Sequence, residues 1–280
     1  MSCYYPLFGL PAGLEASLTF SSHTLNQCAK PGQSAPHQHQ LDLALYGSSS
    51  SGHWILYDRR QVPHSADVEV RASTYGLSPG ELLVAVPLAS DSPTDAQPEQ
   101  LPKPASKRLD RSPVAERCSL AFHWRGITSS YQGEYPLRMA EVKGGSFLSF
   151  DPLLKPDPAV GRSLVVLVSI SRIQDPSPLT LELFALTSRE LLRTENHARN
   201  RCTIVDLTEE AFSSGPLVMR GKGWVGIPIV IRLSREQAPP SMSVEHTHPP
   251  TELFWEEDRL PGSRIVKSSW LDIPLNTTPT

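Results

Sequence analysis

The 280-residue chain lacks the features that mark several common classes of protein. Its longest purely aliphatic run, residues 164–168, is far shorter than the roughly 20 residues that a membrane-spanning helix needs. The net charge is −3, so no large basic field is available to attract nucleic acid or anionic lipid. The first residues carry no basic stretch of the kind that opens a secretion signal. These absences lead us to expect a cytoplasmic protein that binds neither membranes nor nucleic acid.

Cysteine is scarce, and the spacing of the cysteines excludes a C-x-x-C zinc or redox site. The four cysteines, Cys3, Cys28, Cys118 and Cys202, include no C-x-x-C pair of the sort that binds zinc or exchanges disulfides. Cys118 and Cys202 both fall in strand-like segments and could pair with each other. We favour the interpretation that they are buried thiols in a reducing compartment.

The best-known catalytic and nucleotide-binding motifs are also missing. The chain has no G-x-S-x-G nucleophile elbow, no G-x-G-x-x-G fingerprint and no phosphate-binding P-loop. The sequence therefore gives no ground for expecting a serine hydrolase or a nucleotide-dependent enzyme.

Proline, by contrast, is abundant, with 27 residues. Because proline has no backbone N–H and a fixed φ angle, it is rare inside helices and central strands. A chain so rich in proline is expected to consist of short elements joined by many turns.

Alternation of apolar and polar residues is the main structural signal in the first 89 residues. It recurs in short segments separated by turn residues, which is typical of antiparallel strands. The segments are 14–20, 41–46, 53–57, 67–73 and 81–88. We expect residues 1–89 to form a small N-terminal β unit.

Residues 90–116 differ from their neighbours in composition. They contain five prolines, no aromatic residue and few large apolar residues. Such a segment has little to bury against the entropy of ordering it, so we interpret it as a proline-rich linker.

The third part, residues 117–235, again shows strand-like segments at regular spacing. They are 118–124, 134–142, 146–150, 162–173, 179–187, 202–207 and 224–234. A glycine pair at 144–145 predicts a hairpin between the second and third of these. About seven short strands favour an antiparallel β-sandwich, immunoglobulin-like or related. Residues 236–280 form a proline-rich tail whose tryptophans are expected to pack back on the body.

One segment of the tail has the composition of a metal site. His246 and His248 lie two residues apart, so on an extended chain both side chains point to the same side. Glu252 follows at a distance that would let a carboxylate join them around a divalent metal. The alternative is that both histidines lie in a solvated, proline-stiffened loop, and the sequence leaves the two open.

A loop rich in tyrosine and serine suggests a binding surface in the third part of the chain. Aromatic and small polar residues of this kind supply contact area and adaptable hydrogen bonds in the loops of β-sandwiches. The candidates are Trp124, Arg125, Tyr131, Gln132, Glu134 and Tyr135. An ordinary hairpin loop whose tyrosines cover the core is the competing interpretation.

The sequence thus favours a noncatalytic β-sandwich protein that contributes to a multiprotein assembly, with another protein as its partner and no cofactor. Two further hypotheses remain. One is a metal-dependent enzyme centred on His246 and His248, which a third and fourth converging ligand would distinguish. The other is a carbohydrate-binding module, which would need Trp124, Tyr131 and Tyr135 to form a flat exposed platform.

Overall fold

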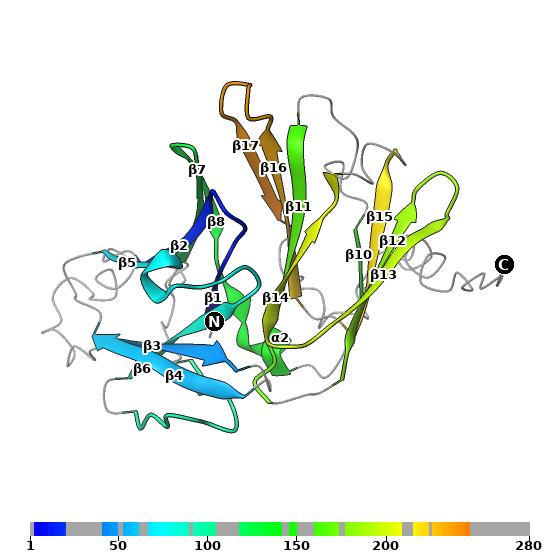
Figure 1. Ribbon diagram of the computed structural model, residues 1–280. Helices are drawn as coiled ribbons and strands as arrows, with labels where there is room; N and C mark the ends of the chain where they lie inside the picture. Colours follow the sequence, from blue (N-terminus) through cyan, green and yellow to red (C-terminus); the bar gives the residue numbers. More distant parts are fainter. Residues whose placement is uncertain are drawn as a thin grey trace, which may run out of the picture.

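The computed structural model is built almost entirely of antiparallel β-strands, with one short helix among the described residues (Figure 1). It describes residues 3–20, 41–49, 53–61, 67–89, 92–104, 118–141, 146–149, 160–173, 177–208, 215–223 and 226–246. The expected class, a mostly β, sandwich-like fold, is confirmed. None of the helical residues in these ranges makes a segment long and apolar enough to cross a membrane.

Two sheets make up the first half of the molecule. The first sheet has the order β4-β3-β6-β1-β9 and the second has the order β5-β2-β7-β8. The first contains β1 (Cys3–Phe8), β3 (Leu41–Ser48), β4 (Trp54–Gln61), β6 (Leu82–Ala89) and β9 (Tyr135–Pro136). The second contains β2 (Leu14–Phe20), β5 (Val68–Arg71), β7 (Cys118–Trp124) and β8 (Ile127–Gln132), and a 3-10 turn (Ser73–Tyr75) follows β5.

The second sheet joins segments from both sides of residues 90–116. β2 pairs with β7 along its whole length, with Leu18 opposite Leu120, and β8 then pairs with β7. β9 likewise pairs with β1 in the first sheet. Three strands that follow the expected linker in sequence therefore belong to the sheets of the N-terminal half.

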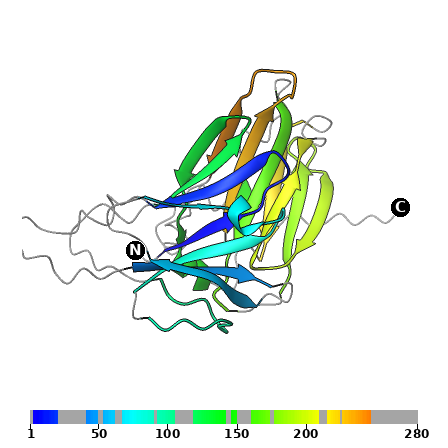
Figure 2. The same ribbon diagram turned by 60° about the vertical axis from the view of Figure 1, so that its left-hand side comes forward.

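The second half consists of a third sheet, β14-β11-β16-β17, and a fourth, β10-β15-β12-β13. The third contains β11 (Val160–Ser169), β14 (Arg201–Asp206), β16 (Gly226–Ser234) and β17 (Met242–His246). The fourth contains β10 (Ser146–Ser149), β12 (Leu179–Ala185), β13 (Leu191–His197) and β15 (Leu217–Lys222). Figures 1 and 2 show the third sheet standing between the blue and cyan N-terminal strands and the yellow-green strands of the fourth sheet.

The third sheet is buried on both faces, and this explains the composition of its central strand. On β11, Leu164, Val166 and Val168 contribute to a large core shared with the first two sheets. Val165 and Leu167 point the other way, into a separate core against the fourth sheet. A strand that faces two cores must be apolar at successive positions, which is why this segment does not alternate.

The hairpin predicted between residues 134–142 and 146–150 is wrong. After β9 the chain turns into α2 (Leu137–Glu141), which buries Met139 and Ala140. β10 pairs with β15 instead of with β9. The strand pattern read into 134–142 came from apolar residues that a single helical turn also gathers on one face.

The described part of the proline-rich segment, residues 92–104, packs against the body. Leu101 has no exposed surface and belongs to the shared core. Tyr4 donates a hydrogen bond from its hydroxyl to the carbonyl oxygen of Pro102, at 3.0 Å. One large apolar residue between prolines thus anchors a segment whose average composition predicted a solvated linker.

Cys3, Cys118 and Cys202 are buried thiols and form no disulfide in the described part of the chain. Burial, and then the negative charge of Glu134, raise the pKa of the Cys118 thiol well above its ordinary value. Burial alone raises the pKa of Cys202. Both groups are therefore neutral and unreactive at physiological pH, in agreement with the interpretation of these residues as buried thiols.

Candidate functional site

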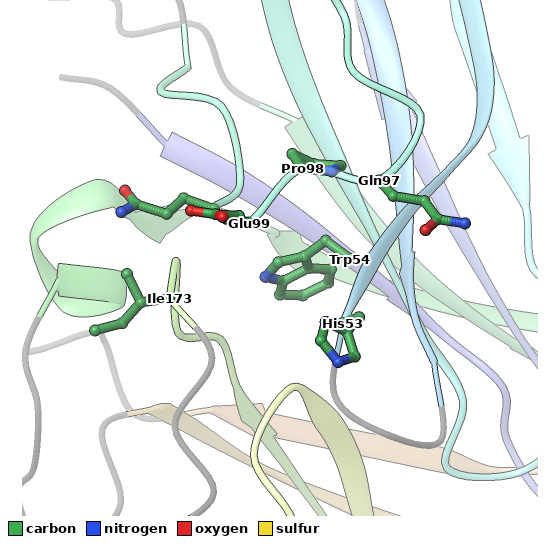
Figure 3. Close-up of a pocket in the computed structure, with 7 residues that line it drawn as sticks. His53, Trp54, Gln97, Pro98, Glu99 and Ile173 are labelled. Atoms are coloured by element: carbon green, nitrogen blue, oxygen red, sulfur yellow. The ribbon is translucent and has the colours of Figure 1, made fainter.

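A pocket of about 430 Å³ lies where β4, the proline-rich segment and the end of β11 meet (Figure 3). We call this pocket the junction pocket. Its described lining comes from three parts of the chain that are distant in sequence. The lining residues are His53, Trp54, Gln97, Pro98, Glu99, Gln100 and Ile173. Its volume is within the range of about 300–1,000 Å³ that is usual for ligand sites, and boundaries between packed units are a preferred place for such sites.

The strap, which we define as residues 96–103, forms one wall of the pocket because both of its ends are fixed. At one end, the N–H of Leu56 on β4 donates to the carbonyl oxygen of Ala96, at 2.9 Å. At the other, the N–H of Leu101 donates to the carbonyl oxygen of Arg172, at 3.0 Å. Gln100 and Ile173 form an antiparallel bridge between these points. The strap therefore ties the first sheet to the chain that leaves β11.

Trp54 forms the floor of the pocket. Its side chain is fully buried, and the indole N–H donates to the carbonyl oxygen of Ser171, at 3.3 Å. Figure 3 shows the indole between Glu99 on one side and His53 on the other. This hydrogen bond holds the floor in register with the segment that carries Ile173.

The rim of the pocket is exposed and of mixed polarity. Ile173 retains 37% of its surface exposed, which makes it one of three large apolar side chains left in solvent among the described residues. Glu99, Gln100 and His53 are also exposed. In Figure 3 the Gln97 side chain points away from the other labelled residues. The pocket therefore offers an apolar contact beside groups that donate and accept hydrogen bonds.

Among the lining residues that the structure describes, none has a hydroxyl, thiol or amine side chain of the kind that usually acts as a nucleophile. Among the residues that the structure describes, no group of three or more histidine, cysteine, aspartate and glutamate side chains is close enough to hold a metal ion.

A serine–histidine contact elsewhere has a structural role. Ser17 Oγ lies 2.9 Å from Nε2 of His123, and Nδ1 of His123 lies 2.9 Å from the hydroxyl of Thr128. Ser17 has no exposed surface, so a substrate has no access to its oxygen. The contact links neighbouring strands of the second sheet and satisfies a buried hydroxyl.

The predicted binding residues at the tip of the β7–β8 hairpin form a turn. Arg125 adopts a positive φ of 47°, and its guanidinium lies 5.2 Å from the centre of the Trp124 ring. Trp124 itself is 9% exposed.

The remaining predicted binding residues lie at the other end of β8 and in the core. Tyr131 stacks on Phe122, with ring centres 6.0 Å apart, and Gln132 is exposed. Glu134 is partly exposed, whereas Tyr135 is fully buried and exchanges two hydrogen bonds with the backbone of Ile170. The structure thus brings these six residues to no common exposed surface.

The predicted metal ligands fall at the limit of the described chain. His246 is the last residue of β17, where its backbone pairs with Ile229. His248 and Glu252 lie outside the described residues. The metal site stays a prediction from the sequence.

The residues of the junction pocket were not identified from the sequence. Trp54 was assigned to a strand, and residues 97–100 to a linker. The one available signal was Leu101, a large apolar residue in a polar segment, which indicates that the surrounding chain returns to the core.

No protein-family model matches this chain, and no curated protein matches it.

Proposed function

We propose that this protein is a noncatalytic interaction protein, an accessory part of a multiprotein assembly, and that it binds a partner polypeptide at the junction pocket. The observation that supports the proposal is the composition of the pocket rim. An exposed isoleucine stands beside amide, imidazole and carboxylate groups over a buried tryptophan. Partner-binding pockets combine an apolar contact with a few polar groups that fix orientation in this way.

The construction of the pocket also suits binding. Its walls are fixed by backbone hydrogen bonds at both ends of the strap, so a partner would meet a preformed surface. Preformed walls favour binding because little conformational entropy remains to be lost.

We also propose that the protein works in the reducing cytoplasm. The three buried cysteines of the described chain, Cys3, Cys118 and Cys202, are thiols and belong to the same core. Proteins of oxidising compartments more often join such residues in disulfides.

Site-specific crosslinking in the cell that makes the protein tests the proposed function. Gln100 is replaced by a photoreactive benzoyl-phenylalanine in the full chain, and Glu190, exposed on the turn between β12 and β13, is replaced in a second version. We expect a discrete adduct with one partner from position 100 and none from position 190. The adduct should weaken several-fold when Ile173→Ser is added, because the exposed apolar contact is then lost.

Equal adducts from both positions, or none from position 100, would contradict a partner site at the pocket. The melting temperature of each variant, measured beside the unmodified protein, identifies any loss that comes from unfolding.

A further inference from the structure

The described lining of the junction pocket contains one carboxylate, Glu99, and no lysine or arginine. Glu99 is exposed on the strap, and Figure 3 shows it beside the indole of Trp54. A ligand that enters this pocket therefore meets a carboxylate next to an apolar floor.

Two cations lie on the segments that form the pocket, and the ion pairs described for both are with Glu141. Arg172 precedes Ile173; its Nε donates to the carbonyl oxygen of Leu101 and its Nη1 to a carboxylate oxygen of Glu141, each at 3.0 Å. Lys103, at the end of the strap, places its ammonium 3.6 Å from the same Glu141 oxygen. Arg172 and Lys103 thus share Glu141, and neither belongs to the described lining of the pocket.

The apolar part of the pocket lies close to this carboxylate. Ile173 and Pro98 supply the exposed and half-exposed apolar walls, and Trp54 supplies the floor. Lysine and arginine combine a long apolar stem with a terminal cation. A side chain of this shape can lay its stem along Ile173 while its charged end reaches Glu99.

We propose that the junction pocket receives a basic side chain, lysine or arginine, of the partner polypeptide. This inference rests on the proposed function and adds the chemistry of the residue that is recognised. Glu99 supplies the charge complementarity, and Gln100 adds an amide acceptor for the remaining donors of a guanidinium or ammonium group. An acidic side chain would be repelled, and a short neutral one would leave the Ile173 wall uncovered.

The probe is a blocked tripeptide, Gly-Arg-Gly, titrated into the full-length protein and followed by the NMR signals of the Trp54 indole N–H and the Gln100 side-chain amide. The matched neutral peptide contains citrulline, which has the shape of arginine without its charge. We expect saturable shifts with the arginine peptide, a weaker effect with the citrulline peptide, and further weakening as salt is raised. Glu99→Gln should weaken binding of the arginine peptide about two- to fivefold, the usual effect of an exposed ion pair.

Glu190→Gln is the control, because it removes the same charge from the β12–β13 turn and should leave the affinity unchanged. Equal affinity for the arginine and citrulline peptides, an unaltered affinity in Glu99→Gln, or no shift with any peptide would each overturn the inference. A crosslinked partner whose binding is indifferent to Glu99→Gln would overturn the basic-residue inference alone. If no crosslinked adduct forms from position 100 in the otherwise unmodified protein, the proposed function fails instead.

Discussion

At the scale of single residues, the most unusual feature is a buried ion pair on the fourth sheet. Arg220 Nε donates to a carboxylate oxygen of Glu182 at 2.5 Å, and the two side chains are 1% and 3% exposed. Lys222 lies 3.3 Å from the other oxygen of the same carboxylate. The Arg220 guanidinium also stands 4.9 Å from the centre of the Phe184 ring. Burial of such a pair is costly for stability unless both charges stay matched.

The pair predicts a pH dependence of stability. Desolvation acts to raise the pKa of Glu182, but the hydrogen bond and charge of Arg220, with help from Lys222, outweigh it, so the folded pKa lies below the ordinary value of 4.5. A depressed carboxyl pKa stabilises the folded state above the unfolded pKa, and this stabilisation is lost as the pH falls through the folded pKa. We expect Glu182→Gln to lower the free energy of unfolding by about 3–5 kcal/mol at neutral pH, because Arg220 is left buried without its counter-charge.

Urea unfolding of both proteins between pH 7 and pH 3 measures the effect. The difference in the free energy of unfolding between the two proteins should narrow as the pH falls from about 4.5 through the lower folded pKa, because Glu182 is protonated first in the unfolded chain and then in the folded wild type. If the difference in the free energy of unfolding stays constant with pH, the carboxylate charge of Glu182 does not contribute to stability. Glu190→Gln, which changes an exposed carboxylate, should follow the wild type throughout.

At the scale of elements, the sequence predicted strands where one face is buried, as in β7, and also where both are, as in β11. The alternation in β7 placed Leu120, Phe122 and Trp124 on one side, and all three are buried. β1, which lies between β6 and β9, was missed; like β11 it is buried at successive positions, but it is only six residues long and contains Pro6.

The position of a proline shows a similar limit. A proline inside a strand favours an edge position or a bulge, yet Pro228 lies in β16, which pairs with β11 on one side and with β17 on the other. The described pairing with β17 runs from Ile229 to Leu233. Pro228 therefore lies next to the end of the described β16–β17 ladder, a position that the sequence of β16 alone does not reveal.

The strap should contribute to stability through one residue. Replacing Leu101 with alanine removes a fully buried side chain from the shared core and is expected to lower the free energy of unfolding by about 2–5 kcal/mol. Leu191→Ala is the matched control, since Leu191 is 39% exposed and its loss should cost about 0.5 kcal/mol or less. Chemical denaturation of the two variants gives both values, and equal effects would mean that the strap is not anchored by Leu101.

At the scale of the whole molecule, the two halves share a core. The cluster that contains Leu18, Leu43 and Leu101 also contains Leu164 from β11 and Ile229 from β16. Each half was recognisable from sequence as a set of strands, but which sheets they join depends on pairings between distant segments. The junction pocket belongs to this level, because residues 53–54, 97–100 and 173 meet only after the sheets have assembled.

The shared core makes a prediction about fragments. A chain of residues 117–235 keeps β7 and β8 but lacks β2, which is the neighbour of β7 on its other side. It would also expose Leu164, Val166 and Val168, the face of β11 that packs on the first half. We therefore expect this fragment to lack a cooperative thermal transition, while the full chain unfolds in a single one. Thermal unfolding of the fragment and of the full chain, followed by circular dichroism, tests this expectation. A cooperative, stable fragment would support the expected division of the chain at residues 90–116.

The pairing of β2 with β7 also bears on how the chain is made. Leu14 faces Trp124, and Tyr4 of the first strand faces Tyr135, so neither N-terminal sheet is complete until the ribosome has delivered the middle of the chain. Until then the apolar faces of β1 and β2 emerge without their neighbours, and contacts this distant in sequence form slowly. The nascent chain is thus expected to depend on holding chaperones through the first half of its synthesis, and to become independent of them only after the third sheet, which completes the shared core, has left the exit tunnel.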